Sequence, residues 1–370
     1  MSEKVKVGLV GCGAISAAYL RMAPNLPILE IAACADLDPA KAAARAAEFG
    51  IPQVCELEEL LADPKIEVIL NLTVPQAHVP IALQALAAGK HTFSEKPLGI
   101  DRAEGERLLA AARAHDLRVG CAPDTFLGAG QQTARQVIDS GRIGQPVAFT
   151  AFNLGRGHES WHPSPEFYYQ PGGGPMFDMG PYYLTALLNL LGPVKRLTAQ
   201  AGIQIPDRVI TSEPKRGQRI RVETPDHVCA GIEFENGAMG TLLTSFAMLH
   251  APYDRQFPIV VYGTEGTLKV PDPNGFDGPV QVRGLGDEEW QEVAHTFPTG
   301  YGRAVGLADL ATALRAGRPH RCSLEQAFGV LDLMQGCLDS SAAGREHRPQ
   351  LPYQRPAPMP ADLPFGQLDS

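Results

Sequence analysis

The sequence predicts an α/β protein whose first part is a Rossmann-type, doubly wound parallel sheet. Three observations predict this class: a glycine-rich turn follows the first apolar strand, strands alternate with helices over the first 120 residues, and later segments are mainly strands. A length of 370 residues is typical of two domains. We expect domains at residues 1–122 and 123–345, followed by a Pro-rich tail at 346–370.

The composition argues against several classes of partner. The net charge is −9 and no run of Lys or Arg could follow a phosphate backbone, so we expect no nucleic acid. No segment reaches the roughly 18–20 consecutive apolar residues of a membrane span, and the N-terminus lacks a signal-peptide pattern. Seven cysteines without a CxxC pair predict a reducing, cytoplasmic compartment and no metal site.

The turn GCGAIS at residues 11–16 predicts dinucleotide binding, because it follows the strand VKVGLV and opens a helix. We expect Gly11 to make the tight turn, and Gly13 to let backbone amides approach a pyrophosphate at the helix N-terminus. The second strand, ILEIAACAD, ends on Asp36. A carboxylate there binds ribose hydroxyls and repels a 2′-phosphate, which favours NAD over NADP.

The alternation continues through the rest of this part. Asp38 and Pro39 begin a helix that stops at Gly50, and VILNLT at 68–73 is a buried strand followed by a helix. The segment KHTFSEKP supplies another strand, Asp101 caps a further helix, and LRVGCA is the sixth strand. The ligand of such a sheet lies beyond the C-terminal ends of its strands.

After residue 123 the pattern is mainly that of strands: VAFTAFNLG, VKRLTAQAGIQI, DHVCAGIEF, AMGTLLTSF, PIVVYG and TLKV. Asn236-Gly237 predicts a hairpin between two of them, and residues 264–266 predict a similar turn. Two helices, RAVGLADLATALRAG and SLEQAFGVLDLMQGCLDSS, follow. The polar, Pro-rich residues from about 345 onward predict an extended tail.

Three motifs resemble those of the Gfo/Idh/MocA oxidoreductases, a family of sugar and inositol dehydrogenases. They are NLTVPQAH (71–78), SEKPLG (94–99) and GGGPMFDMGPYY (172–183). The resemblance implies a C-terminal α/β domain with a large, mainly antiparallel open sheet, whose exposed face forms a homodimer or homotetramer. It also implies hydride transfer at a carbinol carbon of a carbohydrate or polyol.

The resemblance implies that the catalytic residues are Lys96, Asp178 and Tyr182. In most of the family a histidine stands where this chain has Tyr182, and a phenol, with a reference pKa near 10, is a weaker base at neutral pH than imidazole. We expect a lysine beside it to lower that pKa. Asp178 and Tyr182 share a face if both are helical, but Pro181 favours a helix start near 180 and leaves N-capping as an alternative role for Asp178. Lys96 could also be merely exposed.

The loop at 155–175 is rich in aromatic residues that could stack on a sugar or simply pack on the sheet. His162 could replace the missing histidine, and Tyr183 competes with Tyr182. The expected substrate-binding residues are Trp161, His162, Tyr169 and Tyr183. The expected cofactor-binding residues are Gly11, Gly13, Ala14, Ile15, Asp36, Thr73, His78, Glu95, Lys96 and Asp124.

The sequence therefore predicts an NAD-dependent oxidoreductase acting on a sugar, a cyclitol or a sugar derivative. Two alternatives stay open. In the first, the NAD is recycled during elimination or hydrolysis of a glycoside through a transient ketone. In the second, the chain is a nucleotide-dependent regulatory protein without catalysis.

Overall fold

The computed structural model describes residues 3–369, which form two compact units. The first unit contains the chain up to Gln132, His295–Phe328 and the residues from Pro356 onward, and the second contains Thr133–Ala294 and Gly329–Arg355. The predicted domains were continuous, with divisions at 122 and 345. The observed units differ from the predicted domains because a helical pattern in the sequence does not indicate which of the two sheets the helix packs against.

The first unit is built on six parallel strands in the order β3-β2-β1-β4-β5-β6, as expected for a doubly wound sheet. The order reverses between β1 and β4, which is where ligands of such sheets bind. The strands are β1 (Val5–Val10), β2 (Leu29–Ala35), β3 (Gln53–Val54), β4 (Val68–Asn71), β5 (His91–Ser94) and β6 (Val119–Cys121).

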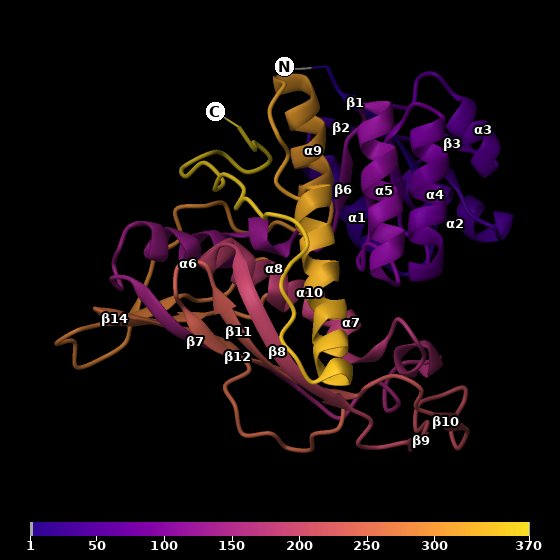
Figure 1. Cartoon of the computed structure of the whole chain (residues 1–370). Coiled ribbons are helices and arrows are strands. Elements are labelled where there is room, and N and C mark those ends of the chain that lie inside the picture. Colours follow the sequence, from indigo (N-terminus) through magenta and orange to yellow (C-terminus); the bar gives the residue numbers. More distant parts are fainter. Residues whose placement is uncertain (1–2, 370) are drawn as a thin grey trace. The chain divides into compact units, whose positions relative to one another are not determined.

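The helices of the first unit begin at the residues that the sequence indicated. The Asp38 carboxylate accepts a hydrogen bond from Ala40 N at 3.0 Å, and Asp101 accepts one from Glu104 N at 2.8 Å. Helices α4 and α5 run side by side (Figure 1). The helices are α1 (Ser16–Met22), α2 (Pro39–Phe49), α3 (Leu57–Ala62), α4 (Pro75–Ala87), α5 (Arg102–His115) and α9 (Val305–Ala316).

The second unit is built on an eight-stranded sheet in the order β16-β15-β14-β13-β7-β12-β11-β8. Every pair is antiparallel except β12 and β7. The strands are β7 (Pro146–Leu154), β8 (Val194–Gly202), β11 (His227–Phe234), β12 (Met239–Ser245), β13 (Ile259–Gly263), β14 (Gly266–Val270), β15 (Gln281–Gly284) and β16 (Gln291–Glu292), with β9 (Asp207–Val209) and β10 (Arg219–Arg221) forming a separate ribbon.

The two turns predicted in this unit are confirmed. Gly237, with φ +91°, lies in the hairpin between β11 and β12, and residues 264–265 connect β13 to β14. The strands β9, β10, β15 and β16 were not predicted, because runs of two to four residues are too short to show an alternating pattern.

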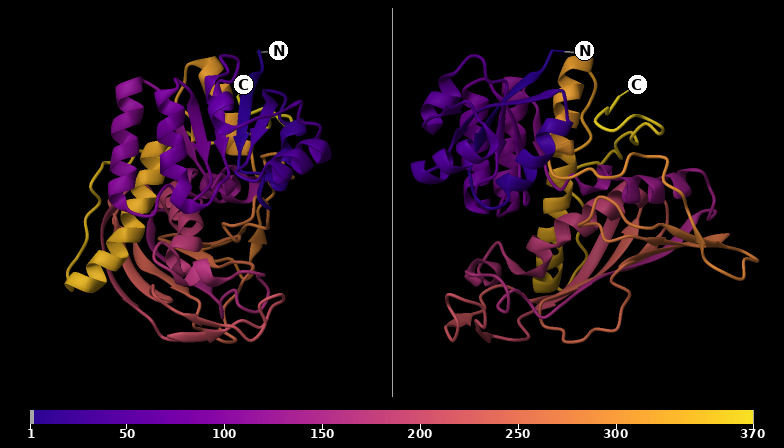
Figure 2. Two further views of the ribbon diagram at one scale, coloured as in Figure 1. Left: turned by 90° about the vertical axis from the view of Figure 1, so that its right-hand side faces the viewer. Right: turned by 180° about the vertical axis from the view of Figure 1, so that it is seen from behind.

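Helices cover one face of the large sheet and one of its edges. All twelve residues of α8 (Gly180–Leu191) are buried, and α7 (Gly174–Asp178) precedes it. In Figure 2, α6 (Ala129–Asp139) and α8 lie on one face, and no described helix lies on the other. At the edge, Ser340 and Ser341 of α10 (Leu324–Ala343) accept hydrogen bonds from β8 amides at 3.1 and 2.8 Å. This protects an otherwise unpaired strand edge.

The C-terminal segment is extended, as predicted, but it is anchored at several points. Leu197 of β8 pairs with His347 through two backbone hydrogen bonds in the second unit. In the first unit, Arg321 Nε donates to the carbonyl of Ala357 at 3.1 Å, and Met359 and Leu368 are buried. A Pro-rich composition predicts the extended backbone and not these anchors.

Candidate functional site

The two glycines of the turn after β1 differ: one is required by the surrounding protein, and the other faces open space. Gly11 has φ +95°, and a Cβ there would lie 2.7–2.9 Å from the backbone of Leu72 and Thr73. A Cβ on Gly13 would meet no atom within 4 Å, and residues 13–15 are exposed. The fold therefore requires glycine at 11 but not at 13. The open backbone at Gly13, Ala14 and Ile15 fits the close approach of a dinucleotide pyrophosphate.

Asp36 lies at the rim of this turn. Its carboxylate accepts hydrogen bonds from Cys12 N at 2.7 Å and from Asp38 N at 2.9 Å. Arg45 of α2 also reaches the turn, where it donates to the carbonyl of Gly13 at 3.1 Å. Sequence reasoning considered only the residues directly after Asp36 and missed this arginine, because a helical turn brings it back to the strand end.

His78 joins two loops at the C-terminal edge of the sheet. Its Nδ1 lies 2.8 Å from the carbonyl of Pro97 and its Nε2 lies 3.1 Å from that of Thr73, and the residue is 1% exposed. Burial lowers the pKa of the imidazole. Both ring nitrogens face backbone carbonyls and fix the positions of those two loops, and the expectation that His78 contacts the cofactor stays a prediction. Thr73, expected to bind the cofactor, is half-buried and donates through Oγ1 to Asn71.

Glu95 holds the segment that carries Lys96. One carboxylate oxygen accepts from the Tyr19 hydroxyl at 2.9 Å and the other accepts from Lys96 N at 2.9 Å. Glu95 is buried and Lys96 is half-buried. Each carboxylate oxygen therefore has a donor inside the first unit, and the expected contact of Glu95 with the cofactor stays a prediction. Lys96 follows β5 by two residues, at the edge where the ligand of a Rossmann sheet binds.

Asp124 is also a structural residue. Its carboxylate accepts hydrogen bonds from Ala304 N and Gly306 N, each at 3.1 Å, and Arg303 lies 3.6 Å away. Complete burial raises the pKa of Asp124. This carboxylate holds the beginning of α9, and its expected contact with the cofactor stays a prediction.

In the second unit, Asp178 is the last residue of α7, and Met179 separates it from α8. Asp178 and Tyr182 therefore do not share a face of one helix. The capping alternative is not supported, because α8 has Met179 as its N-cap and no side-chain capping hydrogen bond. The Asp178 carboxylate instead lies 3.0 Å from Nε2 of His158.

Sequence reasoning missed His158. Its ring centroid lies 3.9 Å from that of Tyr168, 4.7 Å from that of Phe246 and 5.2 Å from that of Trp161. The segment GRGHESWH contains two histidines four residues apart, and nothing local distinguishes the one that meets Asp178. The other, His162, accepts a hydrogen bond from Ser164 N at 3.0 Å within its own loop.

The remaining aromatic residues differ in how far they are buried. Tyr169 is fully buried, bonded to Glu159 and to His158 N, with Arg208 over its ring at 4.7 Å. Tyr183 is buried, which raises the pKa of its phenol, and its hydroxyl bonds to Asn153. The expectation that these two tyrosines bind substrate stays a prediction, and their observed partners lie within the second unit. Trp161 is 61% exposed.

Tyr182 is buried in the first turn of α8. It follows the break at Met179, and its amide donates to the carbonyl of that residue at 3.0 Å. Tyr182 stays the predicted proton acceptor, with Tyr183 and His162 as the alternatives.

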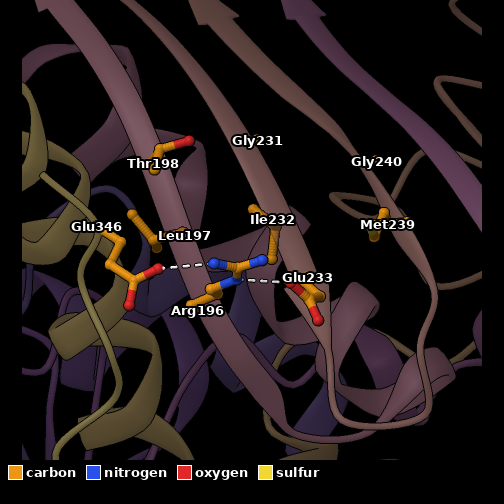
Figure 3. Close-up of a pocket in the computed structure, with 9 residues that line it drawn as sticks. All are labelled: Arg196, Leu197, Thr198, Gly231, Ile232, Glu233, Met239, Gly240 and Glu346. Carbon is orange, nitrogen blue, oxygen red and sulfur yellow. Dashed lines mark hydrogen bonds and ion pairs between the residues drawn. The ribbon is translucent and has the colours of Figure 1, made fainter.

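A depression of about 320 Å³ lies elsewhere on the second unit, over β8, β11 and β12 (Figure 3). Arg196 spans it and forms ion pairs with Glu233 at 2.6 Å and Glu346 at 2.9 Å. Its lining residues are Arg196, Leu197, Thr198, Gly231, Ile232, Glu233, Met239, Gly240 and Glu346, none of which is a predicted site residue.

Two features were not found within residues 3–369. No group of three or more His, Cys, Asp or Glu side chains could hold a metal ion there. No helix in that range is both long and apolar enough to cross a bilayer.

Comparison with known proteins identifies the family. Residues 5–122 match the oxidoreductase family model with an NAD-binding Rossmann fold, and residues 131–269 match the Gfo/Idh/MocA C-terminal domain. An uncharacterized oxidoreductase of Schizosaccharomyces pombe is 29% identical over 64% of this chain and 69% of its own. The dTDP-3,4-didehydro-2,6-dideoxy-alpha-D-glucose 3-reductase of Streptomyces antibioticus is 30% identical over 73% of this chain and 76% of its own.

Solved structures share the fold. Levoglucosan dehydrogenase, in a complex with NADH and L-sorbose, superposes with a TM-score of 0.81 over 95% of this chain and 100% of that one, at 22% identity. The matches cover both the glycine-turn domain and the domain that carries GGGPMFD. The chain belongs to the Gfo/Idh/MocA family and is an NAD-binding oxidoreductase.

Proposed function

We propose that this protein is an NAD(H)-dependent dehydrogenase or reductase that transfers hydride at a carbinol carbon of a sugar, a cyclitol or a sugar derivative. The observation that carries the proposal is the glycine turn with open backbone at residues 13–15, on a sheet in which Lys96 follows the end of β5 by two residues. The Streptomyces relative is named as a reductase of a deoxysugar nucleotide, and the levoglucosan dehydrogenase was solved with a sugar bound.

The cofactor would be held by the turn amides of residues 13–15 and, at its ribose, by Asp36. A bound nicotinamide supplies or accepts the hydride. The chain itself handles the proton: the Lys96 ammonium hydrogen-bonds the reacting oxygen, and Tyr182 takes the hydroxyl proton during oxidation and returns it during reduction. Asp178 accepts a hydrogen bond from a substrate hydroxyl and orients it. Trp161 is the exposed aromatic ring that can stack on a sugar face.

We also propose a homodimer or homotetramer that forms through the open face of the large sheet. Along β8 and β11 the residues alternate between buried and more exposed positions, as in a sheet with one face in the core. The depression in Figure 3 lies over three strands of this sheet. All seven cysteines are free thiols, which supports a reducing compartment such as the cytoplasm.

A screen of sugars, inositols and their oxidised forms with NAD⁺ and NADH tests the enzymatic proposal. We expect reduced nicotinamide to accumulate in proportion to a keto or lactone product for at least one polyol. Product without net change in nicotinamide absorbance would favour the recycling lyase or hydrolase. Cofactor binding with no turnover across the panel would favour the regulatory alternative.

A further inference from the structure

We propose that His158 is a positioning residue that orients the Asp178 carboxylate. The Nε2–H group of His158 donates to an oxygen of Asp178, at a distance of 3.0 Å. The inference rests on the proposed function for the role of Asp178, but the contact itself lies wholly within the second unit. Tyr182 stands four residues after Asp178 in the chain, and the imidazole at Asp178 comes from a preceding loop.

The contact is largely shielded from water. The side chain of His158 is 16% exposed and that of Asp178 is 15% exposed. A hydrogen bond to a carboxylate is stronger than one between neutral groups, and low exposure strengthens it further. Asp178 ends a helix of five residues, so an additional bond limits the rotation of its side chain. A fixed carboxylate loses less conformational entropy when it binds a hydroxyl.

Aromatic rings fix the orientation of the imidazole. The rings of Tyr168, Phe246 and Trp161 surround it at centroid distances of 3.9–5.2 Å, with interplanar angles of 59–75°. Phe246 directly follows β12, whereas the other two belong to the 155–175 loop. Packing from two separate segments of the chain keeps the Nε2 edge turned toward Asp178.

A buried ionic network anchors the loop directly beside His158. Arg208 donates to Glu159 at 2.9 Å, to Asp226 at 2.7 Å and to the carbonyl of Arg156, and all three charged side chains are at most 8% exposed. The Tyr169 hydroxyl donates a hydrogen bond to Glu159 and accepts one from His158 N at 3.1 Å. Removing one partner of such a network leaves a buried charge unpaired, so the loop is held firmly. The backbone of His158 is thus fixed independently of Asp178.

Three variants test the assignment. His158→Phe keeps a ring among the three aromatic neighbours and removes the hydrogen bond. His158→Gln keeps an N–H donor. His227→Phe is the matched control, because it removes another imidazole hydrogen bond of 3.0 Å, to Ser245, in the same unit. We expect His158→Phe to lower kcat by roughly 10- to 100-fold, the scale of a lost hydrogen bond to a charged group, with KM for NAD⁺ unchanged and the fold retained.

His158→Gln should recover most of the lost kcat. No such recovery is expected if the imidazole serves only to fill space. A His158→Phe enzyme within twofold of wild type, or a glutamine variant as slow as the phenylalanine variant, would overturn the inference.

The proton NMR spectrum separates this inference from the proposed function. We expect a downfield, slowly exchanging imidazole N–H resonance that His158→Phe and Asp178→Ala both remove and His227→Phe leaves in place. If that resonance is present but no polyol is turned over, the proposed function fails and the pairing stands. If the resonance is absent from the wild type, the positioning role is refuted whatever the kinetics show.

Discussion

The two units hold their polar side chains by different means. In the first unit, several candidate side chains bond to backbone groups: His78 faces the carbonyls of Thr73 and Pro97, and Asp36 accepts from the amides of Cys12 and Asp38. In the second unit, His158 and Asp178 hold each other through their side chains. A backbone partner is present whichever residue carries it, whereas a pair of side chains requires both residues, so the second arrangement depends on a pairing that one motif does not contain.

The comparison also separates residues that support a site from residues that could touch a ligand. His78, Asp124 and Tyr169 are buried, with partners inside their own units. Residues 13–15, Lys96 and Trp161 retain exposed surface. The following variants test whether the residues with exposed surface bind a ligand and the buried ones support the structure.

Lys96→Met carries the largest expected effect. The methionine keeps the length of the side chain but removes the ammonium that is proposed to bind the reacting oxygen. We expect turnover to fall by roughly 10²- to 10⁴-fold with cofactor affinity and Tm preserved, as measured by steady-state kinetics, calorimetric titration and thermal unfolding. A variant that unfolds would show that Lys96 supports the structure instead.

Tyr182→Phe should come next and distinguishes the two neighbouring phenols. We expect a fall of about 10²-fold or more in kcat, and loss of the rate increase toward alkaline pH, because the titrating hydroxyl is gone. Tyr183→Phe should leave kcat nearly unchanged and lower stability by about 1 kcal/mol through its lost bond to Asn153. Loss of activity in His162→Ala with Tyr182→Phe still active would place the base in the loop.

Gly13→Val should weaken NAD⁺ binding without changing stability. The added side chain meets open space in the protein but fills the approach of a pyrophosphate. We expect at least a tenfold rise, roughly 1.4 kcal/mol, in the dissociation constant. Gly11→Ala is the contrasting variant, since it should lower Tm through its clash with the Leu72 backbone and its positive φ. Unchanged NAD⁺ affinity in Gly13→Val would remove the turn from the binding site.

Asp36→Ser should change the choice between the two cofactors, not turnover. Wild type is expected to bind NAD⁺ more tightly than NADP⁺, and the substitution should narrow that gap by about 1–3 kcal/mol. Calorimetric titration of both cofactors measures it. Arg45→Ala, at the rim of the same turn, is the companion variant. If it changes the preference for NAD⁺ over NADP⁺ more than Asp36→Ser does, the arginine is the main determinant of cofactor choice.

The fold was predictable because its signals are local. The glycine turn, the caps at Asp38 and Asp101, and the Asn236-Gly237 hairpin each arise from a few adjacent residues. The assignment of α9 to the first unit could not be predicted. It depends on the buried carboxylate of Asp124, which binds amides about 180 residues away.

The candidate site was predictable only in part. Lys96, Asp178 and Tyr182 could be proposed from their motifs, yet the break at Met179 and the pairing of Asp178 with His158 could not. Phe246 and Arg208, which orient or anchor that histidine, lie 88 and 50 residues beyond it in the chain. No pattern in one sequence reports such distant packing.

The most direct test of the account uses a substrate deuterated at the carbinol carbon that is oxidised. The reduced cofactor is isolated after turnover and examined by NMR. The account predicts that the deuterium is recovered at nicotinamide C4 in the accumulated NADH, with one equivalent of ketone formed and a slower rate than the unlabelled substrate gives. Deuterium returned to a rearranged or hydrolysed product, with no labelled NADH accumulating, would contradict it.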